Sequence, residues 1–393
     1  MADEGSLHIV VFPWLAFGHM IPFLELSKSL AKRGHHISFL TTPRNIVRLP
    51  KLPPSLAPLI GFIPIPLPSS DDLPDNAEAT VDLLPADVQY LKKAYDGLDR
   101  PIAKFLEQAS PRPDWIIQDF TPHWVSPIAA ELHIPCAMLN TFPAYFNAFI
   151  YGPDGVGMRR SAEQLIAAPE WIPFPTAAAY RPFEARQFHC LLQDVDASGL
   201  SAAYRFELVV RRCKFMALRG CMELDQQLLG TISELFNKPV VPVGLLPPPV
   251  DEGEEKIAHT TRMMNIFRWL DERTPRSVVY VSMGSEAMLS SELVQELALG
   301  LELSDLPFLW ALRRPAGMPK EVELLPEGFE DRIAGNGLVV MDWAPQVRIL
   351  AHESVGGFLT HGGWGSIIEG LGFGHPLVFL SVFGDQMYHL KRD

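Results

Sequence analysis

The chain has 393 residues, of which 48% are hydrophobic and 20% charged, a composition typical of a globular protein large enough for two domains. Its formal net charge of −13 at pH 7 makes nucleic acids and anionic membrane surfaces poor partners. The four cysteines show neither a paired motif nor a metal-ligand spacing, so we expect free thiols in a reducing compartment.

The beginning of the chain carries acidic residues where a secretory signal peptide needs basic ones. No apolar run reaches the length that spans a bilayer. We therefore expect a cytoplasmic protein without a membrane span.

The first half alternates between strands and helices. An apolar run over residues 7–12 predicts a buried strand, and apolar spacing predicts a helix from about His19 to the glycine stop at Gly34. Further strands are predicted over residues 36–41, 113–120, 134–139, 215–221 and 240–243, and further helices over 81–108 and 223–236.

Two stretches of this half lack such a pattern. Residues 50–86 are rich in proline, which predicts an extended surface loop and no core element. Residues 152–200 are predicted to be irregular. They contain Asp194-Val195-Asp196, which matches the DxD motif of metal-dependent glycosyltransferases, but no strand precedes it and we expect no metal there.

The clearest linker begins at residue 245, where prolines are followed by an acidic run. We therefore predict a first domain over residues 1–244, a linker over 245–260 and a second domain over 261–393. The second half continues with strands over 277–281, 307–312 and 337–341 and a helix over 289–303. Strand–helix alternation in both halves predicts two α/β domains of the nucleotide-binding type with parallel sheets.

Residues 343–386 carry the strongest functional signal. A short apolar run ends in His361 and a glycine pair, and an apolar-periodic helix then starts near Ser366, an arrangement that presents backbone N–H groups to a phosphate. Glu369, one helical turn later, could accept hydrogen bonds from ribose hydroxyls. Ser366 and Glu369 also fit a capping box, which needs no ligand, and glycine-rich turns are common in α/β proteins.

The complete ordered set in this region resembles the signature box of plant UDP-dependent glycosyltransferases of small molecules, family 1. The matching residues are Trp343, Gln346, His352, His361, Gly363, Trp364, Ser366, Glu369, Gly374, Pro376, Asp385 and Gln386. Two positions depart from the family pattern: Gly365 replaces the usual Asn and Ser381 a usual Pro. A glycine at the first position also occurs in the branch that adds a sugar to an existing sugar, and residues 277–313 and 238–249 look most like that branch.

The resemblance implies a GT-B fold, with two facing Rossmann-like domains of which the first binds the acceptor and the second the UDP-sugar. It implies His19 as the catalytic base and Asp119 as its carboxylate partner. The residues implied in UDP-sugar binding are Gly284, Ser285, Trp343, Ala344, Gln346, His361, Gly363, Trp364, Gly365, Ser366, Glu369, Asp385 and Gln386. Phe120, Phe142 and Phe146 are candidates for the acceptor wall.

Several of these residues also have a simpler interpretation. His19 could cap a helix or be merely exposed, and Asp119 could be the N-cap of a helix from His123 onward. Gly284-Ser285 could be an ordinary strand-to-helix turn, and aromatic side chains at helical spacing often form plain core.

The implied activity is inverting, metal-independent transfer from a UDP-sugar, UDP-glucose above UDP-rhamnose, to a hydroxyl of a flavonoid, a terpenoid or one of their glycosides. The UDP-sugar is a co-substrate, no cofactor is implied, and we expect a monomer. One alternative is a catalytically silent UDP-sugar binder. Another, a Rossmann dehydrogenase, needs a GxGxxG motif after the first strand, where residues 12–18 offer one glycine.

Members of the family continue past the position of Gln386. The resemblance therefore implies that the second domain is truncated at its C-terminus. We expect residues 377–380 to lie near an uncovered sheet edge and the chain to be marginally stable and weakly active.

Overall fold

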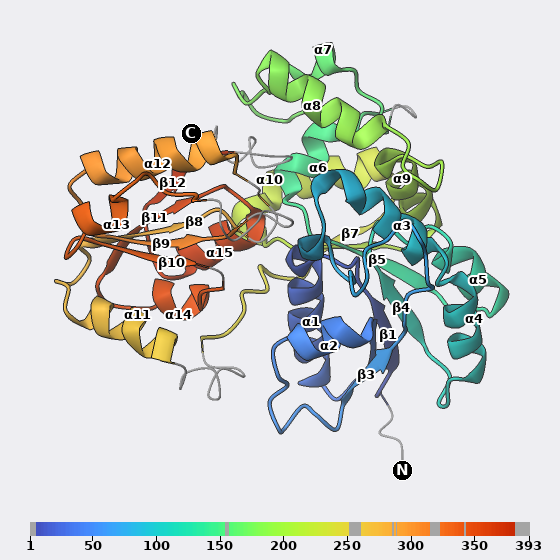
Figure 1. Cartoon of the computed structure of the whole chain (residues 1–393). Coiled ribbons are helices and arrows are strands. Elements are labelled where there is room, and N and C mark those ends of the chain that lie inside the picture. Colours follow the sequence, from blue (N-terminus) through green and yellow to red (C-terminus); the bar gives the residue numbers. More distant parts are fainter. Residues whose placement is uncertain are drawn as a thin grey trace. The chain divides into compact units, whose positions relative to one another are not determined.

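The computed structural model describes residues 5–153, 157–250, 261–284, 287, 289–314, 323–341 and 343–381 (Figure 1). The chain divides into two compact units, with the division between Leu246 and Pro247. Each unit is built around one parallel β-sheet.

The sheet of the first unit has seven strands in the order β3-β2-β1-β4-β5-β6-β7. The strands are β1 (His8–Phe12), β2 (His36–Thr41), β3 (Ile60–Pro64), β4 (Trp115–Gln118), β5 (Cys136–Asn140), β6 (Met216–Leu218) and β7 (Val240–Pro242). The strand order runs outward in both directions from β1 and β4, which are neighbours in parallel register, with Phe12 opposite Gln118. In open α/β sheets, ligands bind at such a switch point, beyond the carboxyl ends of the strands.

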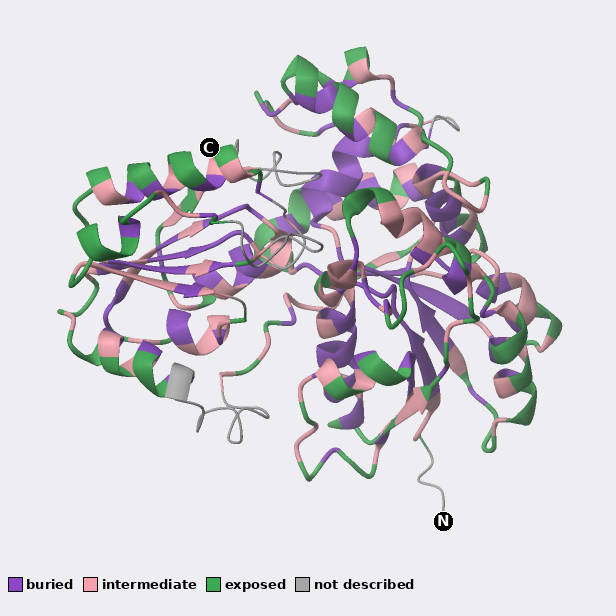
Figure 2. Ribbon diagram, viewed as in Figure 1, coloured by how far each residue is buried: buried purple, intermediate pink, exposed green. Residues whose placement is uncertain are grey.

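Alternation along β1 explains the layers of this unit. Val10 and Phe12 point to one face of the sheet, and Ile9 and Val11 to the other, because successive side chains of a strand alternate. The first face packs against α3 (Val88–Asp96), α4 (Asp99–Gln108) and α5 (Val125–Glu131), and the second against α1 (Phe17–Ala31). Burial on both faces accounts for the apolar runs of the central strands (Figure 2).

The first unit has further helices after β2, between β5 and β6, and after β6. They are α2 (Pro43–Arg48), α6 (Ala144–Ile150), α7 (Ala162–Leu165), α8 (Pro182–Gln193), α9 (Ala202–Arg212) and α10 (Met222–Phe236), with short 3-10 turns at Thr80–Asp82 and Pro85–Asp87. Helix α6 packs against α10, and α8 packs against both α7 and α9.

The sheet of the second unit has five strands in the order β10-β9-β8-β11-β12. They are β8 (Val278–Ser282), β9 (Phe308–Leu312), β10 (Gly337–Met341), β11 (Val355–Thr360) and β12 (Leu377–Phe379). Helices α12 (Ser291–Leu303) and α13 (Phe329–Arg332) cover one face. Helices α11 (Thr261–Asp271) and α14 (Gln346–Leu350) cover the other, and α15 (Trp364–Gly372) joins β11 to β12.

Two predictions about the first unit are wrong. Residues 50–86 are not all surface loop, because β3 pairs with β2 over five residues. This proline-containing strand lies at the sheet edge, the position where a missing N–H costs no ladder hydrogen bond. Residues 152–200 are not irregular, because they contain α7 and α8, and α8 buries Ala185, Phe188 and Leu192 at helical spacing.

Two features of the described chain concern its surface. Within the described residues, β12 lies at one edge of its sheet, and Val378 is 56% exposed. None of the helices in the described ranges combines the length and the apolar composition needed to cross a lipid bilayer.

Candidate functional site

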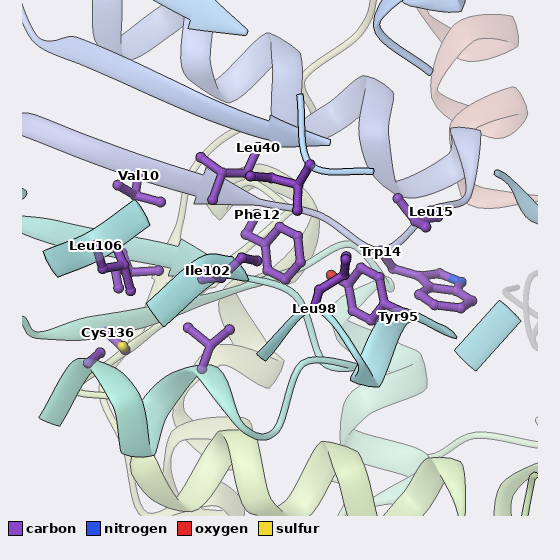
Figure 3. Close-up of a cluster of buried hydrophobic side chains, with 14 of the residues drawn as sticks. Val10, Phe12, Trp14, Leu15, Leu40, Tyr95, Leu98, Ile102, Leu106 and Cys136 are labelled. Carbon is purple, nitrogen blue, oxygen red and sulfur yellow. The ribbon is translucent and has the colours of Figure 1, made fainter. Parts of the chain in front are cut away.

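The first group of candidate residues gathers at the switch point of the seven-stranded sheet. His19 lies in the first turn of α1, shortly after β1, and Asp119 directly follows β4. Tyr95 of α3 holds the loop between β1 and α1, because its ring stacks on Phe12 and its hydroxyl donates a hydrogen bond of 2.9 Å to the carbonyl of Pro13. Figure 3 shows these rings packed together with Trp14 at the end of the strand.

The structure brings His19 and Asp119 into direct contact. His19 Nδ1 lies 2.9 Å from Asp119 Oδ2, with the carboxylate almost fully buried and the imidazole partly exposed. The backbone N–H of Trp14 donates to the same Oδ2 at 3.0 Å, and the N–H of Phe120 donates to Oδ1 at 2.7 Å. A buried carboxylate held by two amides has a fixed position, so it can fix the imidazole in turn.

The alternative interpretation of Asp119 as a helix cap is wrong. Helix α5 begins at Val125, and its N-cap residue is Trp124. The carboxylate of Asp119 instead turns back toward the loop that follows β1.

Aromatic side chains surround the imidazole. The rings of Phe120 and Phe142 each have their centroid 5.6 Å from that of His19, and Phe146 stacks on Phe142 at 5.0 Å. Phe206 of α9 approaches Phe120 at 6.5 Å, and Phe188 of α8 approaches Phe146 at 5.7 Å. The three predicted aromatic residues therefore lie together, and two further aromatic residues from α8 and α9 extend the group.

One polar neighbour of His19 was missed from the sequence. Thr141 Oγ1 lies 3.1 Å from His19 Nδ1. The available signal was topological: Thr141 directly follows β5, the strand beside β4, so the carboxyl ends of these parallel strands meet at one edge.

The second group lies at the switch point of the five-stranded sheet, where β8 and β11 are neighbours with Ser282 opposite Thr360. Gly284 and His361 follow these strands. A Cβ atom built on Gly284 would lie 2.4 Å from the His361 ring, and one on Gly363 would lie 2.5 Å from its Nε2. The imidazole is thus held between two glycine backbones, where no side chain would fit.

Helix α15 begins at Trp364, and its N-cap is Gly363, which offers no capping side chain. Ser366 therefore lies inside the first turn, and the capping-box interpretation of Ser366 and Glu369 is wrong. The first amides of any helix lack intrahelical partners, and the helix dipole favours an anion there. Amides in such a helix turn can donate hydrogen bonds to an anion.

Polar residues of the predicted nucleotide site contact one another along α14 and α15. Gln346 Nε2 donates to Glu369 Oε2 at 2.7 Å and to Ser366 Oγ at 3.3 Å. Ala344 lies partly buried just before α14, and Gly365 in the first turn of α15. Trp343 is 54% exposed, so its side chain is accessible to a ligand. Ser285, Asp385 and Gln386 lie outside the described residues.

The DxD match has a structural explanation. Asp196 Oδ2 lies 3.1 Å from the guanidinium of the buried Arg205, and Asp196 Oδ1 accepts a hydrogen bond of 2.8 Å from the N–H of Ser198. The carboxylate therefore holds the start of α9.

Comparison with known proteins places these two groups of residues in context. A family model described as UDP-glucoronosyl and UDP-glucosyl transferase matches residues 244–392. UDP-glycosyltransferase 91D1 of Stevia rebaudiana is 47% identical, covering 98% of this chain and 78% of that protein. Soyasaponin III rhamnosyltransferase of Glycine max is 40% identical, covering 98% of this chain and 80% of that protein.

Solved structures show the same fold. UGT89C1 of Arabidopsis thaliana complexed with UDP-L-rhamnose has a TM-score of 0.73 at 24% identity, covering 98% of this chain and 82% of that one. UGT2 of Phytolacca americana complexed with UDP-2fluoro-glucose and pterostilbene has a TM-score of 0.69 at 26% identity, covering 98% and 83%. The predicted GT-B fold is confirmed.

Proposed function

Because the chain belongs to the plant family 1 UDP-glycosyltransferases, we propose that it transfers a sugar from a UDP-sugar, with inversion, to a hydroxyl of a small lipophilic glycoside. The family predicted from the signature box is confirmed by these relatives, and so is the resemblance to the branch that glycosylates glycosides. The family's reaction is metal-independent. The single observation that carries the proposed mechanism is the 2.9 Å contact between His19 and the buried Asp119.

We assign the base to His19 on physical grounds. An ionised carboxylate facing Nδ1 favours the tautomer that carries its proton on Nδ1, which leaves the lone pair on Nε2 to take a proton. Asp119 also stabilises the imidazolium that forms. As the acceptor hydroxyl loses its proton to His19, its oxygen attacks the anomeric carbon of the sugar, and the bond from that carbon to UDP breaks on the opposite side.

The second unit supplies the donor residues in this proposal. The N-terminal turn of α15 and His361 bind the diphosphate and stabilise the negative charge that develops on it. Glu369 accepts from the ribose hydroxyls, with Gln346 beside it, and the exposed face of Trp343 stacks on uracil. Trp364, with Asp385 and Gln386, contacts the sugar.

The aromatic group around His19 supports the proposed acceptor class. Phe120, Phe142 and Phe146 offer flat apolar faces next to the proposed base, which suits a flavonoid or terpenoid core. A relative from Petunia hybrida, 34% identical, is named anthocyanidin-3-O-glucoside rhamnosyltransferase, which supports a glycoside as acceptor.

There are two candidates for the donor sugar. A glutamine at the position of Gln386 resembles enzymes that use UDP-glucose, which is our first candidate. UDP-rhamnose is the second, because relatives from Glycine max and Petunia hybrida are named rhamnosyltransferases. The four free cysteines suit a reducing compartment, so the proposal places the enzyme in the cytoplasm.

To test the proposed activity, the protein is incubated with each UDP-sugar and a panel of flavonoid and terpenoid glycosides and their aglycones. Mass spectrometry detects the added sugar, and NMR reports the anomeric configuration of the product. We expect a hexose or deoxyhexose added to at least one glycoside with inversion. UDP-sugar binding without transfer to any acceptor would support the silent binder instead, and a retained anomeric configuration would contradict the mechanism.

A further inference from the structure

The turn that follows β5 contacts the imidazole of His19. Thr141, buried at 7% exposure, places Oγ1 3.1 Å from His19 Nδ1, and the ring of Phe142 stands edge-on to the imidazole at an interplanar angle of 77°. Two consecutive residues of one turn therefore contact the same ring. Both contacts are separate from the one between His19 and Asp119.

This turn is held by a pair of buried asparagines. Asn140 Oδ1 accepts from the N–H of Phe142 at 3.0 Å, and Asn140 Nδ2 donates to Asn147 Oδ1 at 2.6 Å. Asn147 Nδ2 in turn donates to the carbonyl of Pro143 at 2.9 Å. Both asparagine side chains are buried, and they bond to each other and to the backbone of Phe142 and Pro143, directly after Thr141. This network holds the turn that carries the Thr141 hydroxyl.

Two oxygen atoms thus face one ring nitrogen. Asp119 Oδ2 can only accept when it is ionised, so it selects the tautomer with a proton on Nδ1. The hydroxyl oxygen of Thr141 then accepts a share of the same N–H. A proton held between two acceptors fixes the rotation of the ring more tightly than one acceptor does, and both acceptors stabilise the imidazolium.

We propose that Thr141 is a positioning residue for His19: its hydroxyl shares the Nδ1 proton with Asp119 and fixes the plane of the imidazole, so that Nε2 faces the acceptor hydroxyl. This inference rests on the proposed function, in which His19 is the base. It adds a third group to the pair that the sequence indicated.

The test compares Thr141→Val, which keeps the shape and removes the hydroxyl, with Thr141→Ser, which keeps the hydroxyl. We expect Thr141→Val to lower kcat by about 3- to 10-fold, the size of one hydrogen bond, and to leave the UDP-induced rise in melting temperature unchanged. The acid limb of the kcat/KM profile should move to lower pH, because the imidazolium loses an acceptor. Thr141→Ser should restore both properties.

A readout independent of turnover is the Nδ1 proton of His19, observed by NMR in protein labelled with 15N-histidine. Thr141→Val should shift this resonance and speed its exchange with water, and Thr141→Ser should restore it. The matched control is Thr42→Val, because Thr42 is fully buried and its hydroxyl has no hydrogen-bond partner among the described residues. If Thr141→Val does not fold, Thr141→Ala carries the same expectations.

The outcomes separate this inference from the proposed function. Unchanged kcat, pH profile and Nδ1 resonance in Thr141→Val, with an inactive His19→Ala, would overturn the inference alone. An active His19→Ala would overturn the assignment of the base, and the response of the Nδ1 resonance would still show whether Thr141 holds the ring. A fall in kcat that Thr141→Ser does not reverse would assign the effect to packing and overturn the inference.

Discussion

Gln346 Nε2 donates a hydrogen bond of 2.7 Å to Oε2 of Glu369, so two residues expected at the nucleotide site contact each other. The bond joins α14 to α15 and orients the carboxylate. Because Gln346 also reaches Ser366, one amide links the proposed ribose-binding carboxylate to the helix turn proposed for the diphosphate.

Glu369→Ala should therefore reduce the rise in melting temperature that UDP produces, since a ligand that binds only the folded state stabilises it. Gln346→Ala should reduce it less, because the carboxylate remains but loses its orientation. Thermal unfolding with and without UDP measures both effects. Glu330→Ala, at an exposed position of α13, is the control, and an equal UDP shift in wild type and Glu369→Ala would contradict the ribose role.

Gly284 supports a second prediction, because it combines a positive φ of 75° with contact to His361. Gly284→Ala should destabilise the second unit by about 1–3 kcal/mol through backbone strain and should displace the imidazole. We expect a lower melting temperature and a weaker UDP shift. Gly300→Ala is the control: a Cβ there meets nothing within 4 Å, and alanine in mid-helix should stabilise by about 0.5–1 kcal/mol. A normal UDP shift in Gly284→Ala would show that His361 tolerates the added methyl group.

The strand–helix alternation that makes two parallel sheets could be predicted from the apolar runs. The roles expected of His19, Asp119 and His361 came from the resemblance to the family, and the structure shows that each of these residues follows a strand with a clear apolar run. The side-chain contacts made at these strand ends could not be predicted, because they depend on the strand order and on the path of each turn. Thr141 meets His19 across 122 residues, and the position of Asn140 in the sequence says nothing of its bond to Asn147.

The failures in element prediction have the same origin. Strand β3 contains a proline, and only its place at the sheet edge makes that residue acceptable. Helix α8 buries one narrow apolar stripe against its neighbours in a stretch rich in polar and aromatic residues, so its period is hard to recognise before those neighbours are known.

The buried Arg205 gives a prediction about stability. Its guanidinium lies 2.6 Å from Asp96 Oδ2 and 3.1 Å from Asp196 Oδ2, and the side chain has no exposed surface. Burial lowers the pKa of Arg205. The hydrogen bonds and charges of Asp96 and Asp196 raise it by more, so this pKa lies above its usual range. Arg205→Met would leave two carboxylates without this partner and should destabilise the first unit by about 3–5 kcal/mol.

Urea unfolding measures this effect, and Arg211→Met is the matched control on the same helix. The side chain of Arg211 is 65% exposed and lies 3.8 Å from Glu207, so its loss should cost less than about 1 kcal/mol. Equal unfolding free energies for the two variants would show that the cluster around Arg205 does not hold α9.

His123 gives a prediction about pH. Burial lowers the pKa of His123, the charge of Asp96 raises it and that of Arg205 lowers it, and the net shift is downward from 6.5. Between the pKa of His123 in the folded chain and its pKa in the unfolded chain, the unfolded chain therefore binds one proton more at this residue. Stability from this group is complete above about pH 6.5 and falls as the pH drops below it, by at most about 1.4 kcal/mol per pH unit.

His123→Gln should flatten the loss of stability between pH 7.5 and 5.5, as urea unfolding at the two pH values would show. His36→Gln, at an exposed position, controls for the removal of one imidazole. A variant with the full wild-type loss would mean that His123 is protonated as readily in the folded chain as in the unfolded one.

The measurement that most directly tests the central claim is turnover of UDP-sugar by His19→Ala, made beside the UDP-induced melting shift of the same protein. A base contributes about 10²- to 10⁴-fold to such a reaction and does not touch the nucleotide in our proposal. Asp119→Asn should cost less, because the imidazole remains. We predict that His19→Ala loses turnover by this factor and keeps the UDP shift of the wild type. Turnover close to the wild-type rate would contradict the assignment of His19 as the base.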